Sequence, residues 1–463
     1  MKNNYTTIIT FLQGPLQKII TVIGEKLNFV KRLRKVNALS LVLALIGTAL
    51  TSKNMTMPSI VDEFKKQGGD ITVQGVLKRL NENAVKLLRE ILFTLFEHLS
   101  DNWNVQGEYL KLTKKFSGVY IADCTNIKLS ESLEDKYKGC GRTSDKAGMK
   151  LFVRLNLLNG KITQFEIRPG RTSDQKFKGF TAPLPKNSLV LHDRGFYNIK
   201  QLQQREEKGS FYISRVMATT IIWYKGVKYT LSNFLSMMGQ KADSLDVMVL
   251  VGGDKFPTRL VASKVTKEVE NKRRKKLREK ARTSQKRRKK EPSKVQLDIC
   301  KWTVYITNLP SAEYDTEVVH TLYRTRWQIE LLFKHWKSEG GLAVPPCKNG
   351  EKNLCLVYAK MISILLTHSI LNESGSQING QSVKRRYKVI KRYADELFQA
   401  MYTNQYDEVL NVLQKTINHM KKVDLQHNRH GNPSTRNTLI KPPIGIFIHE
   451  KHLFEPVFSE SKP

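Results

Sequence analysis

Up to about residue 99, apolar side chains recur every three or four positions, a spacing typical of amphipathic helices. The run 36–50 is almost wholly apolar, but at about fifteen residues it is short of the ~20 needed to span a bilayer. We therefore interpret it as a buried helix. After a break at 68–70, the pattern predicts one long helix over about 72–99. With Lys78 and Arg79 exposed, this order of elements is compatible with a helix-turn-helix and equally with a plain helical bundle.

From residue 116 the pattern becomes that of strands. The predicted elements are strands at 119–123, 150–158, 161–167, 188–193 and 211–216, with a helix over about 198–207. Asn159-Gly160 is a strong hairpin signal, and the order of elements describes an α/β layer. Two of the apolar runs end in an acid, Asp123 and Asp193. Because a buried acid is costly unless it is paired or bound to a metal, the two strand-end acids together favour a functional site.

Between about residues 217 and 298 the composition changes to short β-like runs followed by a dense basic segment. The runs are 220–224, 227–231, 247–251 and 260–264. The basic segment, 267–290, is either a helix or a disordered arm. For its role we favour contact with phosphates; the alternatives are a solvated linker and a localisation signal. A last strand over 302–309 returns to the core.

The stretch 323–337 predicts one amphipathic helix, with Asp315 or Thr316 as its cap and Gly340-Gly341 as its stop. One side of the helix is apolar. At ~100° per residue, a sector roughly 60° wide carries a phenol, a guanidinium, a carboxylate and an ammonium. These belong to Tyr323, Arg326, Glu330 and Lys337. By itself the stripe indicates only a solvated charged face. Further helices are predicted over 353–371 and within 383–420.

The formal net charge of +36 on 463 residues favours a polyanionic partner. Nucleic acid is the partner we expect, and a membrane surface is its competitor. The five cysteines are scattered without the spacing of a zinc site or a disulfide framework, which indicates a reducing cytoplasm.

Asp123, Asp193 and Glu330 form a set of three carboxylates, the type of ligand set that holds two divalent cations ~3.5–4 Å apart across a phosphate. Hard oxygen ligands suit Mg²⁺ or Mn²⁺ rather than zinc. A phosphodiester substrate also agrees with the positive charge of the chain.

With these residues in place, the chain resembles the DDE transposases of the bacterial insertion-sequence-four family, whose signature is Tyr-x2-Arg-x3-Glu-x6-Lys. Tyr323, Arg326, Glu330 and Lys337 match that signature without a gap. The resemblance covers about 119–342 and extends weakly over the N-terminal helices. It includes the segments that begin at Asp123 and Asp193, the strand end at 307–309 and the β-rich stretch between the second Asp and the Glu.

The resemblance implies a ribonuclease-H-like catalytic core interrupted by a β-rich insertion, with helical N-terminal and C-terminal regions. The segments would be 1–105 (helical, DNA-binding), 106–216 and 301–375 (core), 217–300 (basic insertion) and 376–463 (helical or irregular). It also implies cut-and-paste transposition by a cytoplasmic, nucleoid-associated homodimer acting on terminal inverted repeats and target DNA. In such enzymes a metal-activated water nicks the element's end, and the freed 3′-hydroxyl then forms a hairpin and later attacks target DNA.

The resemblance further implies that Asp123, Asp193 and Glu330 carry two Mg²⁺ or Mn²⁺ ions, and that Tyr323, Arg326 and Lys337 hold phosphates. A flipped base is expected to stack on an aromatic residue of the insertion; Trp223 and Trp302 are candidates, but we expect each to be a core residue. One departure concerns the second acid, since some members continue Asp-Arg-Glu-Ala-Asp where this chain has Asp-Arg-Gly-Phe-Tyr from residue 193.

Two other hypotheses belong to different classes. One is a catalytically silent DNA-binding protein derived from a transposase, against which the intact set of three acids argues. The other is a nuclease that does not transpose, which nothing beyond the shared core supports.

Overall fold

The computed structural model describes residues 11–12, 14–29, 36–52, 54–101, 115–140, 146–288, 292–343, 347–373, 383–403 and 405–422. These fold into two compact units. Unit 1 is drawn from the described residues within 1–108, 123–179 and 328–434, and unit 2 from those within 109–122 and 180–327. The predicted mixed α/β class is confirmed. The division into five segments stays a prediction, and the tail beyond residue 422 lies outside the described residues.

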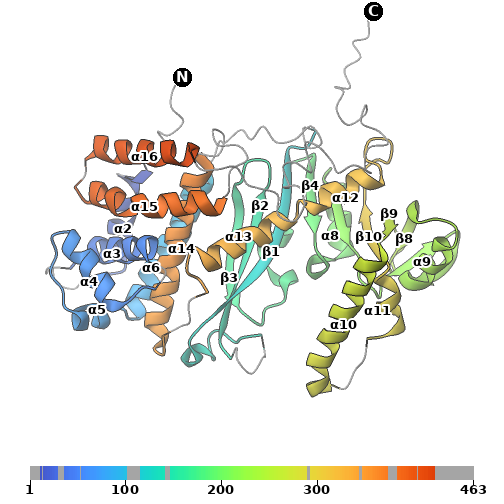
Figure 1. The fold of residues 1–463 in the computed structure, drawn as a ribbon, viewed down its shortest axis with the longest axis horizontal. Coiled ribbons are helices and arrows are strands. Elements are labelled where there is room, and N and C mark those ends of the chain that lie inside the picture. Colours follow the sequence, from blue (N-terminus) through green and yellow to red (C-terminus); the bar gives the residue numbers. More distant parts are fainter. Residues whose placement is uncertain are drawn as a thin grey trace, which may run out of the picture. The chain divides into compact units, whose positions relative to one another are not determined.

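Unit 1 is mainly helical (Figure 1). Its helices are α2 (Pro15–Lys26), α3 (Ala38–Thr51), α4 (Met57–Lys66), α5 (Val73–Arg79), α6 (Glu82–Asp101), α13 (Trp327–Ser338), α14 (Gly350–Glu373), α15 (Val383–Tyr402) and α16 (Tyr406–Lys421). Asn37 caps α3 through a capping box with Ser40, and α3 is buried along most of its length, which confirms the predicted buried helix.

Helix α14 packs against α6 and α3 in the core of unit 1. Its stretch Gly350–Leu371 is long and apolar enough by composition to cross a membrane, but 89% of its apolar 18-residue window is buried inside the protein. Burial of this kind is expected of the core helix of a folded domain.

The predicted helix over 72–99 is wrong in one respect, because the chain forms two helices, α5 and α6. The break lies at Leu80 and Asn81. The Asn81 side chain accepts the backbone N–H groups of Asn83 (3.0 Å) and Ala84 (3.3 Å), so it starts a new helix rather than continuing the old one. The order α4, glycine-containing turn, α5 agrees with the helix-turn-helix pattern, and a DNA-binding role for it stays a prediction.

Unit 1 also contains the predicted hairpin. Strands β2 (Gly148–Asn156) and β3 (Ile162–Pro169) pair antiparallel, and β2 lies beside the last part of β1 (Gly118–Lys128). Asp123 was expected to end its strand, but β1 continues through Lys128. The reason is that positions from Thr125 to Lys128 alternate between buried and exposed, as in a strand with one solvated face, so the strand continues without a continuous apolar run.

Unit 2 is built on a sheet in the order β1-β4-β5-β10-β9-β8-β6-β7. The strands are β4 (Ser188–His192), β5 (Phe211–Arg215), β6 (Ile221–Tyr224), β7 (Val227–Thr230), β8 (Ser244–Val251), β9 (Phe256–Lys264) and β10 (Trp302–Thr307). The first part of β1 pairs parallel with β4, and β4 pairs parallel with β5, whereas β10 and the strands of the insertion pair antiparallel. Because β10 bonds both to β5 and to β9, the insertion extends the same sheet.

Unit 2 also carries helices that bear on the predictions. They are α8 (Ile199–Glu207), α9 (Leu231–Gly239), α10 (Lys267–Arg288), α11 (Lys294–Ile299) and α12 (Thr316–Arg324). The basic segment is a helix, α10, which was one of the two predicted alternatives; the other was a disordered arm. Helix α9 was missed, although Thr230 as its cap and the apolar pair Leu231 and Phe234 are signals that predict it.

The helix predicted over 323–337 is likewise two helices, α12 and α13. At the junction the backbone N–H groups of Thr325 and Arg326 return to the carbonyls of Leu322 and Tyr323 in tight turns. The Thr325 hydroxyl also donates to the Leu322 carbonyl at 2.6 Å, a local bond that competes with regular helix. The predicted cap is confirmed, because Asp315 accepts the backbone N–H of Val318 at 2.8 Å.

Candidate active site

Asp193 directly follows β4 in unit 2. This strand is buried along its whole length between the parallel strands β1 and β5. At Asp193 the backbone is extended (φ −81°, ψ 169°), and it then enters a short 3-10 turn, Arg194–Phe196. The side chain therefore emerges at the end of a central strand, as predicted for this acid.

Arg215, at the end of β5, is a cation that lies close to Asp193 in unit 2. Its Nη1 lies 3.7 Å from Asp193 Oδ1, an ion pair but too long for a hydrogen bond. Among the described residues that buried oxygen has no hydrogen-bond partner. An unsatisfied buried carboxylate oxygen is costly unless a donor or a cation reaches it. Asp193 therefore fits the role of a metal ligand.

Tyr323, on the last turn of α12, lies against the same end of β4. Its hydroxyl donates to the His192 carbonyl (3.2 Å), and its ring centroid is 4.3 Å from that of Tyr305. Burial raises the pKa of the Tyr323 phenol, and Asp193 raises it further, while Arg326 and Arg215 lower it. The phenol is therefore neutral, and unit 2 brings Asp193, Tyr323 and Arg326 together around the end of β4.

Helix α12 links this end of the sheet to the insertion. Thr316 Oγ1 donates to Asp246 Oδ2 (3.3 Å), and Asp246 Oδ1 accepts from Nε of the buried Arg259 (2.6 Å). One turn along the helix, Nε2 of His320 lies 3.0 Å from Oγ of Ser263 on β9. These contacts fix α12, and with it Tyr323, on the strands of the insertion.

The other predicted site residues belong to unit 1. Asp123 lies within β1, where continuous burial stops, and its Oδ1 accepts the backbone N–H of Cys124 at 2.7 Å. Glu330 is in the first turn of α13 and Lys337 in the last, and a spacing of seven residues puts them on the same side of the helix. The Lys337 ammonium is half-buried without a partner among the described residues, and desolvation lowers its pKa.

The predicted residues thus form two sets, Asp123, Glu330 and Lys337 in unit 1 and Asp193, Tyr323 and Arg326 in unit 2. Within each unit, the described part of the chain has no group of three or more His, Cys, Asp or Glu side chains that could hold a metal ion by itself. Sequence reasoning missed Arg215, and its signal was a basic residue at the end of the apolar run that forms β5.

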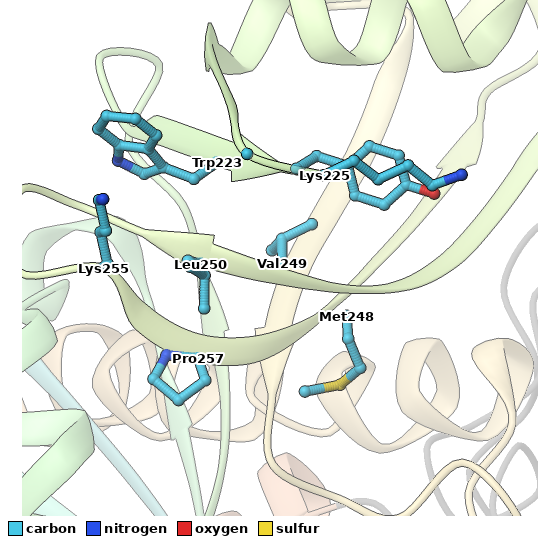
Figure 2. Close-up of a pocket in the computed structure, with 9 residues that line it drawn as sticks. Trp223, Lys225, Met248, Val249, Leu250, Lys255 and Pro257 are labelled. Atoms are coloured by element: carbon cyan, nitrogen blue, oxygen red, sulfur yellow. The ribbon is translucent and has the colours of Figure 1, made fainter.

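The insertion offers an open groove of about 300 Å³, lined by Trp223, Met248, Leu250 and Lys255 among others (Figure 2). The Trp223 indole N–H donates to the Gly252 carbonyl (3.1 Å), and the Lys255 ammonium lies 4.5 Å from the ring centroid. The groove therefore combines an accessible aromatic ring with a cation.

The two tryptophans named as candidates for base stacking have different environments. Trp302 is 6% exposed and is a core residue, as expected. Trp223 was also expected in the core, and this is wrong, since it is only partly buried. The reason is that β6 lies next to the outermost strand β7, where nothing in the described part of unit 2 fully covers this ring.

A family profile described as "Transposase DDE domain" matches residues 114–366 of this chain. The chain is 27% identical over 411 residues to a transposase for insertion sequence element IS231F of Bacillus thuringiensis subsp. israelensis, covering 83% of this chain and 85% of that protein. It is 26% identical over 340 residues to a transposase for insertion sequence element IS1151 of Clostridium perfringens, covering 68% and 69%.

Among solved structures, the fold is similar to that of the piggyBac transposase in a cryo-EM synaptic complex with hairpin DNA. The TM-score is 0.51 at 10% sequence identity, covering 95% of this chain and 89% of that chain. At this identity the likeness concerns the fold alone.

Proposed function

Because this chain belongs to the transposase DDE domain family, as its sequence predicted, we propose that it moves an insertion sequence by a cut-and-paste reaction through Asp123, Asp193 and Glu330. The reaction cleaves phosphodiester bonds at the ends of the element and transfers the freed 3′ ends to target DNA. The observation that carries the assignment of the site is the buried Asp193 oxygen, which no hydrogen bond satisfies within the described residues.

Asp123, Asp193 and Glu330 would hold two Mg²⁺ or Mn²⁺ ions. Asp123 lies where the continuous burial of β1 stops, and Asp193 directly follows the fully buried β4, which supports the assignment of each as a ligand. When bound, such ions supply Lewis acidity and an activated water. Arg215 would help to offset charge at Asp193, because its guanidinium already lies 3.7 Å away.

The signature cations would hold phosphates near the cleaved bond. The half-buried Lys337 ammonium supports this role, because a desolvated cation without a partner among the described residues is stabilised by an incoming anion. Arg326 suits bidentate phosphate contact. Tyr323 donates to a backbone carbonyl, and we assign it first to positioning the end of β4 and only second to phosphate contact.

Trp223 is the residue we propose for the flipped base. Support comes from its place on an open groove with Lys255 over the ring, since an aromatic face and a nearby cation suit a base and its phosphate. The buried Trp302 is excluded from this role.

The finer assignments complete the proposal. They are a ribonuclease-H-like core interrupted by the insertion, a homodimer on paired transposon ends, and a cytoplasmic, nucleoid-associated location. The parallel strands β1, β4 and β5, and the return of β10 beside β5, support such a core. The net charge of +36 supports association with DNA.

The test is cleavage in Mg²⁺ of duplex DNA that carries the element's own terminal repeats. Asp123→Asn is expected to abolish nicking while end binding is retained, because the amide keeps the shape of the side chain but loses the charge that holds a cation. Asp135→Asn, at an exposed acid of unit 1, is the matched control and is expected to nick normally.

Full activity of Asp123→Asn would remove Asp123 from the ligand set. Binding of the ends by the wild-type protein without any nicking, even in Mn²⁺, would instead indicate a silent DNA-binding protein. Nicking without joining in a strand-transfer assay would indicate a nuclease.

A further inference from the structure

Helix α10 is held to the insertion along one side. Arg273 donates from Nη1 to the Trp302 carbonyl (2.8 Å) and from Nη2 to Thr303 Oγ1 (2.9 Å). On the same side Glu270, only 5% exposed, forms an ion pair with Arg274 (2.8 Å). Helix α11 follows α10 in the chain and leads back to β10. The helix is therefore a fixed part of unit 2, and its first turns are charge-compensated.

Another side of α10 carries a row of cations, with the exposed Glu279 beside it. Lys275, Arg278 and Arg282 are exposed, and at ~100° per residue they fall within a sector about 60° wide, over ~10 Å of helix. Lys272 and Lys276 are exposed on the adjoining row. None of these five cations forms an ion pair or side-chain hydrogen bond with another described residue. Their mutual repulsion is tolerable only in contact with solvent or a polyanion.

The composition of the helix narrows the class of polyanion. The sequence of α10 has no aromatic residue, so it offers no surface on which unpaired bases could stack. Its apolar residues Leu277 and Ala281 are half-buried on the anchored side, and the exposed Val269 stands alone, so no continuous apolar face remains for a membrane. Lys and Arg side chains contact phosphates, and such contacts carry no information about base sequence. About 10 Å of duplex DNA carries on the order of six phosphate charges, enough for every exposed cation of this face.

We propose that the row Lys275, Arg278 and Arg282 binds the phosphate backbone of duplex DNA without regard to base sequence. This inference rests on the proposed function, since a transposase must hold DNA on both sides of the bond that it cleaves. It adds a DNA-binding surface on the insertion, apart from the residues near the end of β4.

The test compares the salt dependence of DNA binding in matched triple variants of the full chain. The first is Lys275→Gln, Arg278→Gln and Arg282→Gln; glutamine preserves helix propensity, which circular dichroism checks. The control, Lys186→Gln, Lys208→Gln and Lys241→Gln, removes the same charge from exposed positions elsewhere in unit 2. The affinity for a duplex of random sequence is measured between about 50 and 200 mM salt.

We expect the plot of log affinity against log salt to lose about one unit of slope per cation removed from α10, about three in all. The control is expected to change it by less than one unit. Affinity for terminal-repeat duplex should fall by the same factor as for random duplex. A charge-conserving triple variant, Lys275→Arg, Arg278→Lys and Arg282→Lys, should keep the wild-type slope.

Three outcomes would overturn the inference: a slope equal to that of the control, a loss confined to terminal-repeat duplex, or a loss confined to single-stranded DNA. Nicking of terminal-repeat DNA by the wild-type protein is followed in parallel. If nicking is absent while the α10 slope falls as expected, the proposed function fails and the DNA contact of α10 stands. If nicking is present and the slope is unchanged, only the inference about α10 fails.

Discussion

The polar side chains at the end of β4 and those of the insertion have opposite environments within unit 2. At the end of β4, Tyr323 is buried and hydrogen-bonded, and Asp193 has a buried oxygen that lies near a guanidinium. Across the insertion, Trp223 faces an open groove and the cations of α10 are exposed. In the first region each group depends on a few defined neighbours, so single substitutions should have large effects. In the second region, electrostatic and stacking contributions of several residues add up, so the effect of a single substitution should be smaller.

The largest effect should come from Asp193→Asn. Loss of a carboxylate that we propose as a metal ligand should remove several kcal/mol of transition-state stabilisation, so we expect end cleavage to fall by about 10³-fold or more. Stability should change by less than about 1 kcal/mol, because the ion pair with Arg215 is long and partly exposed. Single-turnover cleavage and chemical denaturation measure the two quantities. Asp254→Asn, at an exposed acid of the insertion, is the control. Equal cleavage by the two variants would erase the contrast between the regions.

Next in size should be Trp223→Ala in the insertion groove. Base stacking on an aromatic ring contributes about 1–3 kcal/mol, so the rate of end cleavage should fall by about 10- to 100-fold. Trp223→Phe should recover much of this loss, since it keeps a ring. The matched control is Met248→Ala, which truncates a side chain of the same groove that is 64% exposed. If both alanine variants lose the same activity, the groove contributes shape rather than stacking.

Lowering the pH is expected to have a smaller effect per pH unit, through helix α12, which links the two regions. Burial, followed by the charge of Arg324, lowers the pKa of His320 to about 4, below the ordinary value of about 6.5. Between these values the unfolded chain binds a proton that the folded chain does not. The free energy of unfolding should therefore fall by up to about 1.4 kcal/mol per pH unit as the pH drops from about 6.5 to 4.

This contribution is fully present above pH 6.5, and His320→Gln should reduce the slope of stability against pH by its share. Denaturation at a series of pH values measures that slope. His368, whose pKa burial also lowers to about 4, should keep part of the pH dependence in the variant. An unchanged slope would show that His320 is accessible to solvent in solution, and α12 would then be less firmly fixed to β9 than its contact with Ser263 indicates.

The smallest of these effects should be that of Tyr323→Phe on stability. The variant loses the hydrogen bond to the His192 carbonyl, which is worth about 1 kcal/mol. DNA affinity should hold, and the cleavage rate should fall, if the hydroxyl positions the end of β4; a residue that mainly contacts phosphate would weaken binding instead. Measuring affinity and rate on the same duplex separates these roles. The same pattern with Tyr305→Phe, which removes the hydroxyl of the neighbouring ring, would show that the effect is not specific to the Tyr323 hydroxyl.

Much of the fold was predictable where a local signal was strong. The hairpin around Asn159-Gly160, the buried helix over 36–50 and the strands of the insertion all follow from apolar spacing and turn residues. The breaks inside helices were not predictable in this way. Asn81 and Thr325 interrupt helices through side-chain hydrogen bonds to the backbone, and their neighbours keep an apolar spacing that continues across the break.

The candidate site shows the same difference between local patterns and tertiary contacts. The sequence by itself determined which residues we propose for the chemistry, because a match to Tyr-x2-Arg-x3-Glu-x6-Lys together with two acids after apolar runs depends only on residue types and order. It also determined the charge that requires a polyanion. Only the tertiary structure decided that Arg215 lies near Asp193, that Tyr323 is buried against His192, and that Trp223 lines a groove while Trp302 is buried. The physical reason is that burial and hydrogen-bond partners depend on contacts between segments far apart in the chain, which local patterns do not encode.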